Sequence, residues 1–186
     1  WSTTNKWTLS LWNENEVQLK GNNIIDQVEQ LEKELADDII NGTNKAVVPK
    51  GLVCTDNIIT NIGLTESAKR DTGEVSSTLT HNSIGTGTTT PTVSDTDLQT
   101  EDTGGSYARL GYAASGQRKV SNQTGKYGML WDDSKVSAVP ISITESGVHW
   151  NVSSATTMHA RVTFTAFSMT TGDLFVTQIN ELHQNG

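Results

Sequence analysis

The sequence predicts a mainly β protein, an antiparallel β-sandwich of jelly-roll-like form with an N-terminal arm and one or two helices. Among its 186 residues are 27 Thr, 17 Ser and 16 Gly, which favour strands and turns over helices. Charged residues make up only 18%, too few for charge-driven disorder. Several short runs in the second half alternate between apolar and polar residues, as expected for strands with one buried face.

Residues 1–20 are predicted to form an arm or an edge strand. Trp7, Leu9 and Leu11 alternate loosely along it, and Trp1 and Trp12 stand among Ser, Thr and Asn. Indole side chains of this size need a surface on which they are buried. A neighbouring subunit and the chain's own domain are equally good candidates, so the three tryptophans are candidate assembly residues.

The segment Asn23–Asn41 gives the clearest helix prediction. Its apolar residues follow a 4-3-4 spacing that places them on one face, and Gly42 supplies a stop signal. The four residues of this stripe are Ile24, Val28, Leu31 and Leu35. The same spacing fits two heptads of a coiled-coil seam between subunits, and it fits equally a helix docked on its own core with an acidic solvated face.

A linker and a second helix follow. Residues Thr43 to Gly51 contain Pro49 and are predicted to link two parts of the chain, and Asn57–Arg70 is predicted to form a weaker helix. We therefore divide the chain into residues 1–50, an arm and amphipathic helix for assembly, and residues 51–186, a helix and the β-sandwich.

The remaining residues are predicted to form the strands of the sandwich. Residues Ile84–Glu101 are rich in Thr, Gly and Pro and form an extended loop after a short strand. Turns are expected at Ser146-Gly147 and at Thr171-Gly172-Asp173. The predicted strands centre on Val139–Ile143, Val148–Val152, Val162–Ala166 and Phe175–Ile179, with two more at Tyr107–Ala114 and Lys126–Trp131.

Charge and hydropathy exclude two classes of partner. The net charge is -8, and the last 25 residues, which follow Arg161, contain no Lys or Arg to replace the counterions of phosphates. We therefore expect no nucleic-acid binding. No run approaches the roughly 20 apolar residues that cross a bilayer, so we expect no membrane partner.

Enzymatic motifs are missing, so the sequence predicts a protein that is not an enzyme. The Gly85-Thr-Gly87 pair lacks the remaining residues of a phosphate-binding loop, and the chain has no Gly-x-Ser-x-Gly elbow and no HExxH. His149 and His159 are predicted to face outward from strands, and Cys54 to be a small buried residue.

No tightly bound metal or organic cofactor is predicted. The exception is calcium, because Asp95, Asp97 and Asp102 provide hard oxygen ligands within one loop. The EF-hand pattern fails there, since Gln99 occupies the third ligand position. A solvated acidic loop is the favoured interpretation.

Three pieces of the chain, occurring in a fixed order, carry a resemblance to a known family. They are Asn82–Leu98 with Glu101, Ile143–Val148, and Met158–Phe164 with Gly172-Asp173. Over about residues 57–181 the chain resembles a family of structural proteins of tailed phages and related archaeal viruses, often labelled tail-fibre or virion structural proteins. The matching positions are architectural, and Gly147 is expected to let the chain turn between paired strands.

This resemblance implies a non-enzymatic virion component in a tail, a fibre or a capsid decoration, with no catalytic residues to carry over. The expected partners are copies of the chain, with a trimer favoured by analogy to viral fibres, together with other virion proteins and host-surface glycans. The alternative function is a carbohydrate-binding β-sandwich module, in which Trp131 and Trp150 would stack on sugar rings.

Overall fold

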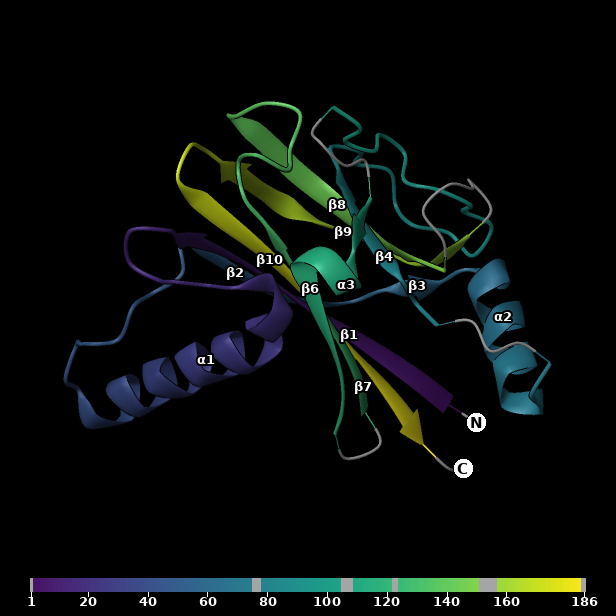
Figure 1. Ribbon diagram of the computed structural model, residues 1–186, viewed down its shortest axis with the longest axis horizontal. Helices are drawn as coiled ribbons and strands as arrows, with labels where there is room; N and C mark the ends of the chain where they lie inside the picture. The colour runs from purple at the N-terminus through teal and green to yellow at the C-terminus, as the bar shows by residue number, and fades with distance from the viewer. Residues whose placement is uncertain (1, 75–77, 105–108, 122–123, 151–156, 185–186) are drawn as a thin grey trace.

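Two five-stranded antiparallel sheets pack face to face in the computed structural model, which describes residues 2–74, 78–104, 109–121, 124–150 and 157–184 (Figure 1). The first sheet has the order β2 (Gly51–Asp56), β1 (Ser2–Asn13), β10 (Asp173–Gln184), β7 (Thr124–Trp131) and β6 (Gly116–Ser121). The second has the order β3 (Ile58–Ile59), β9 (Met158–Met169), β8 (Ile141–His149), β4 (His81–Gly85) and β5 (Leu110–Gly111). The predicted antiparallel β-sandwich is confirmed.

The main core lies between the two sheets and draws apolar side chains from the inner face of each. The first sheet contributes Trp7, Leu9, Leu11, Met129, Trp131, Phe175 and Ile179, and the second contributes Ile84, Ile143, Val148, Val162, Phe167 and Met169. Each fully buried side chain of this size stabilises the fold by about 1.5–3 kcal/mol before the entropy of ordering it. Period-two alternation along the strands is what directs these residues inward.

Strand β1 lies inside the first sheet, so the prediction of an arm or edge strand is wrong. It pairs with β10 along its whole length, from Ser2↔Gln184 to Asn13↔Asp173, and with β2 on its other side. The alternation that predicted an edge strand belongs to an inner strand, because β10 and β2 pair with the two edges of β1. A boundary at residue 50 therefore does not separate these residues from the sandwich.

Helix α1 (Ile24–Asn41) packs on the outer face of the first sheet and confirms the helix prediction. Ile24, Ile25 and Val28 are fully buried in a second, smaller core with Trp12, Leu130, Leu174 and Val176. A single 3-10 turn, η1 (Gly21–Asn23), precedes α1, and Gly42 ends it in the left-handed conformation with φ of 63°.

The segment after α1 contains strands that the sequence pattern did not indicate. β2 and β3 precede α2 (Asn61–Thr72), which begins later than the predicted Asn57–Arg70 helix. β2 is an edge strand whose residues alternate between half-buried and exposed. This alternation leaves Cys54 exposed rather than buried.

Strand β8 is continuous through Ser146-Gly147, where a turn was predicted. Gly147 pairs with Ser83 on one side and Arg161 on the other. A Cβ there would lie 3.1 Å from Leu98 and 3.2 Å from both Ser83 and His149, so the glycine provides close packing inside the sheet. The predicted Thr171-Gly172-Asp173 turn is confirmed, with Gly172 at φ of 80° between β9 and β10.

The remaining strand predictions have mixed outcomes. Lys126–Trp131 lies within β7, whereas β6 was not predicted. Of the predicted strand Tyr107–Ala114, the first two residues lie outside the described residues, and the rest divides between β5 and a short helix, α3 (Tyr112–Ser115). Val152, predicted as a strand residue, also lies outside the described part.

Gly128 on β7 sets how closely α1 approaches the sheet. A Cβ at this position would lie 2.7 Å from Ile25 and 2.9 Å from Ile24. We predict that Gly128→Ala lowers the free energy of unfolding by about 1–3 kcal/mol, because α1 must shift outward. The measurement is urea denaturation followed by circular dichroism.

Gly125→Ala on the same strand is the matched control. A Cβ at Gly125 meets only the Tyr127 ring, at 3.4 Å or more. We expect its effect to stay within about 0.5 kcal/mol. Equal destabilisation by the two substitutions would contradict the proposed contact.

Candidate assembly surface

The rest of the chain covers the first half of α1 most fully, and coverage decreases toward its C-terminal end. Val28 is its last fully buried residue, Leu31 packs partly against the second core, and Ile39 and Ile40 are 73% and 78% exposed. At about 1.5 Å per residue, the helix continues for about 20 Å beyond Val28. Figure 1 shows this end of α1 projecting away from both sheets.

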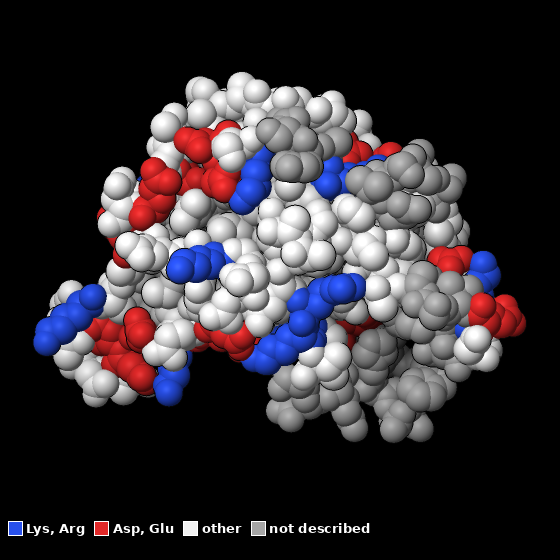
Figure 2. Space-filling model, viewed as in Figure 1, with Lys and Arg blue, Asp and Glu red and all other residues white. Residues whose placement is uncertain are grey.

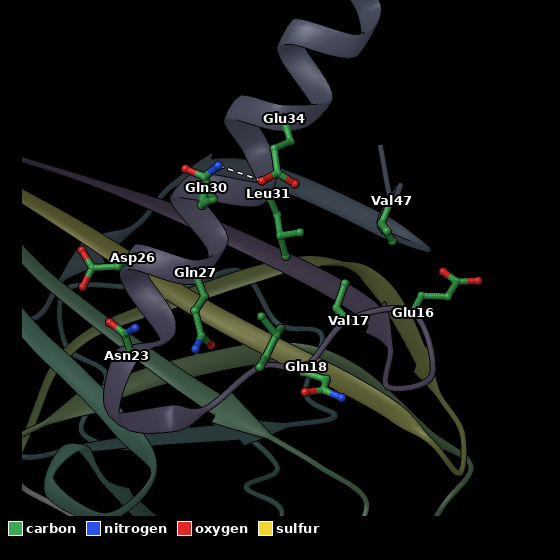
Figure 3. A pocket seen from close by; sticks show the side chains of 11 residues that line it. Glu16, Val17, Gln18, Asn23, Asp26, Gln27, Gln30, Leu31, Glu34 and Val47 are labelled. Carbon is green, nitrogen blue, oxygen red and sulfur yellow. Dashed lines mark hydrogen bonds between the residues drawn. The ribbon is translucent and has the colours of Figure 1, made fainter. Parts of the chain in front are cut away.

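A groove of about 530 Å³ lies where α1 leaves the sheet. Leu31 from the helix, Val17 from the loop after β1 and Val47 from the segment before β2 face the same hollow (Figure 3). Glu16 and Glu34 also line it, and Gln30 donates a hydrogen bond of 2.7 Å to Glu34. The groove therefore has apolar walls and a polar, acidic rim.

Charges anchor the start of α1 to the sheet. Lys119 on β6 pairs with Asp26 at 2.5 Å, and Lys126 on β7 pairs with Glu29. The hydrogen bond from Lys119 is the main cause that holds the pKa of Asp26 below its usual range. Gln117 also accepts a hydrogen bond of 2.8 Å from the backbone N–H of Ile25, which satisfies one free donor of the first turn.

The free end of α1 is acidic and is closed by a defined turn. Glu34, Asp37 and Asp38 lie on its last two turns, and Figure 2 shows carboxylates gathered on this projecting part of the surface, with basic side chains on either side of them. Asp38 accepts hydrogen bonds from the backbone N–H of Lys45 at 2.9 and 3.0 Å and from the Thr43 hydroxyl. These bonds, from Lys45 first, lower the pKa of Asp38.

The structure places the predicted assembly residues in three settings. Trp7, Trp12, Ile24 and Val28 are buried in the chain's own cores, so the prediction that they contact another subunit is corrected. Leu31 and Leu35 are half-buried. Trp1 lies outside the described residues.

Sequence reasoning missed Ile39 and Ile40. The signal was present, because the stripe of Ile24, Val28, Leu31 and Leu35 continues to Ile39 with a spacing of four. What the stripe could not show is that the sheet beneath the helix ends before its last turns.

His149 and His159 are buried, with 0% and 1% exposed, so the prediction that they face outward is wrong. His149 Nε2 lies 2.7 Å from the Ser83 hydroxyl, and His159 Nε2 lies 3.3 Å from Glu181 across the two sheets. The Ser83–His149 pair resembles a nucleophile and its base. Ser83 is itself 0% exposed, so a substrate does not reach this pair in the folded chain.

The carboxylates considered for calcium are directed toward other partners. Asp95 pairs with Arg161 at 2.7 Å, Asp97 pairs with Arg109 at 2.6 Å, and Asp102 accepts a hydrogen bond of 2.9 Å from the backbone of Ser137. Across the described ranges, no group of three or more His, Cys, Asp or Glu is arranged to hold a metal. The guanidinium groups of Arg161 and Arg109 neutralise Asp95 and Asp97.

Glu145 on β8 anchors the long loop that follows β4. Its carboxylate accepts hydrogen bonds from the backbone N–H groups of Gly87, Gln99 and Thr100 at 2.8–3.1 Å. Arg161 on β9 pairs with the same carboxylate at 2.8 Å. The three pieces that carried the family resemblance thus meet through Glu145 and Arg161 in one unit of β4, β8, β9 and the loop.

Neither tryptophan of the alternative carbohydrate site is available at the surface. Trp131 is 0% exposed and donates a hydrogen bond of 3.2 Å to Asn82, and Trp150 is 9% exposed and lies edge-on to His159. They form no sugar-stacking platform.

Comparisons with protein-family models, with curated proteins and with solved structures found no match. No helix within the described residues is both long and apolar enough to cross a membrane.

Glu145 provides the first test of this architecture. We predict that Glu145→Ala lowers the free energy of unfolding by about 3–5 kcal/mol, because Arg161 loses a buried partner and the loop loses its anchor. Glu66→Ala, which removes a surface pair with Lys69, serves as the control and should change stability by no more than about 1 kcal/mol. Similar small effects in both variants would contradict the anchoring role.

The buried His149 provides a pH test. Burial, assisted by Arg109 and His81, lowers the pKa of His149 well below its usual range. Below the ordinary histidine pKa of about 6.5, His149 binds a proton in the unfolded chain but stays neutral in the folded chain. Acidification through this range therefore lowers the free energy of unfolding by up to about 1.4 kcal/mol per pH unit.

The measurement is the free energy of unfolding between pH 7 and about 5 for the wild type and for His149→Gln. The variant should show a shallower loss of stability on acidification. Identical slopes would show that His149 does not cause the pH dependence.

Proposed function

We propose that this chain is a non-enzymatic virion structural protein that acts through protein–protein assembly. The observation that carries the proposal is the second half of α1, an acidic helical segment whose Ile39 and Ile40 are exposed beyond the sandwich. The proposal includes self-association, with a trimer favoured by analogy to viral fibres, and contact with other virion proteins. The virion assignment itself comes from the family resemblance of the sequence.

The polar interior supports a structural role. Glu145, Arg161, Ser83 and His149 are all at least 98% buried, and each bonds to other parts of the fold. An active site needs such groups at a surface that a substrate reaches. Here they fix loops and strands relative to one another.

The second half of α1 supports assembly. Two large aliphatic side chains standing next to each other in water gain about 1.5–3 kcal/mol each when a partner covers them. Their place on a helix that is already ordered keeps the entropic cost of binding low. The burial of Trp131 and Trp150 gives no support to the carbohydrate-binding alternative.

The test of the virion assignment is peptide mapping by mass spectrometry of purified particles of the virus that encodes this chain. We expect its peptides to co-purify with particles through a density gradient in a fixed ratio to the major capsid protein. An abundant host cytosolic protein serves as the contamination control. Absence of the chain from intact particles would contradict the proposed function.

A further inference from the structure

A second exposed apolar position lies on β6, at the opposite end of α1 from Ile40. β6 pairs with β7 alone and forms one edge of the first sheet. Val120 on this edge is 81% exposed, more than any other large apolar side chain described in the structure. It lines a notch of about 460 Å³ together with Thr78, Arg118, Lys119 and Tyr127, which we call the β6 notch.

The β6 notch is basic. Arg118 and Lys119 line it, and none of the described lining residues is Asp or Glu. Lys119 is paired with Asp26 of the same chain, so Arg118 supplies the charge available to a partner. Arg118 donates hydrogen bonds to the Thr78 hydroxyl at 2.9 Å and to the Leu79 carbonyl at 3.3 Å, which hold the guanidinium in place. Val120 and Tyr127 add apolar surface beside these cations. The notch therefore suits a ligand with apolar side chains flanked by carboxylates.

The free end of α1 has that composition. Ile39 and Ile40 are exposed there, Asp37 and Asp38 directly precede them, and Glu34 lies one turn before Asp38. We call these five residues the α1 tip. Tip and notch are complementary in charge, and each exposes large apolar side chains that nothing in the described part of the chain covers.

The tip of one molecule does not reach its own notch. Gln117 of β6 binds the backbone of Ile25 at the start of α1, so the notch lies near the first turn of the helix. Ile40 lies fifteen residues further along, about 22 Å away on a straight helix. A complement to the notch must therefore come from another molecule.

We propose that the α1 tip of one copy docks into the β6 notch of a second copy. Such a contact joins different surfaces of the two molecules and is heterologous. It leaves each dimer with one free tip and one free notch, so assembly continues until it closes into a ring or extends as a filament. The inference rests on the self-association included in the proposed function and names the two surfaces that carry it.

Two substitutions test the α1 tip and the β6 notch separately. Ile40→Asp places a charge on the tip, and Val120→Asp places one in the notch; both positions are more than three-quarters exposed, so folding should be preserved. Val93→Asp, at a 51% exposed position on a loop that belongs to neither surface, is the control. Circular dichroism and thermal unfolding confirm that each variant is folded.

The measurement is sedimentation velocity at tens to hundreds of micromolar. Wild type and Val93→Asp should form species larger than a dimer, whereas each of the other two variants alone should weaken association at least tenfold. An equimolar mixture of Ile40→Asp and Val120→Asp should form a heterodimer and nothing larger, because one intact notch meets one intact tip. High salt should weaken all of these species, since the contact is partly ionic.

Three outcomes would overturn the inference. Wild type that stays monomeric over this range has no such contact. Assembly that persists in both variants runs through another surface, which leaves self-association standing while the named surfaces fail. A mixture that remains monomeric excludes the heterologous arrangement. Peptide mapping of particles is independent of all three, so the virion assignment fails or stands separately.

Discussion

The antiparallel pairing of β1 with β10 brings the first and last strands together at the centre of the first sheet. Residues of these two strands contribute both to the core between the sheets and to the smaller core under α1. Its twelve residue pairs align Trp7 with Ile179 and Leu11 with Phe175 on the inner side. Trp12 and Val176 lie on the opposite face of the sheet and pack against α1. Contacts between residues this far apart in sequence carry a large loop-closure cost, which burial on both faces of the sheet must offset.

The second sheet is stabilised by buried polar groups in addition to the apolar core that both sheets share. Glu145 gathers three backbone N–H groups and Arg161, and Arg109 joins Asp97 and Glu101. Such groups add little net stability relative to an apolar core, but removing one partner is costly because the other remains buried and charged. They tie the long loop after β4 to the second sheet and use its charged groups in internal pairs.

Helix α1 is held by both apolar packing and ion pairs. Its first half obeys the rule that an amphipathic face must be buried, and Lys119 and Lys126 tie its acidic side to the sheet. Its second half continues the same apolar pattern beyond the edge of the first sheet. A helix held at one end and free at the other presents Ile39 and Ile40 without the entropic cost that a flexible loop would pay on binding.

The sequence by itself determined the fold class, helix α1 with its Gly42 end, and the turn at Gly172, because these depend on local periodicity and on φ preferences. Only the tertiary structure decided that β1 is an inner strand, that β8 runs straight through Gly147, and that His149 is buried. The residues of β10 that pair with β1 lie 160 or more positions away, and period two looks the same at an edge as in the middle of a sheet. The exposure of Ile39 and Ile40 could not be predicted from the sequence either, because the helix pattern does not show where the sheet beneath the helix ends.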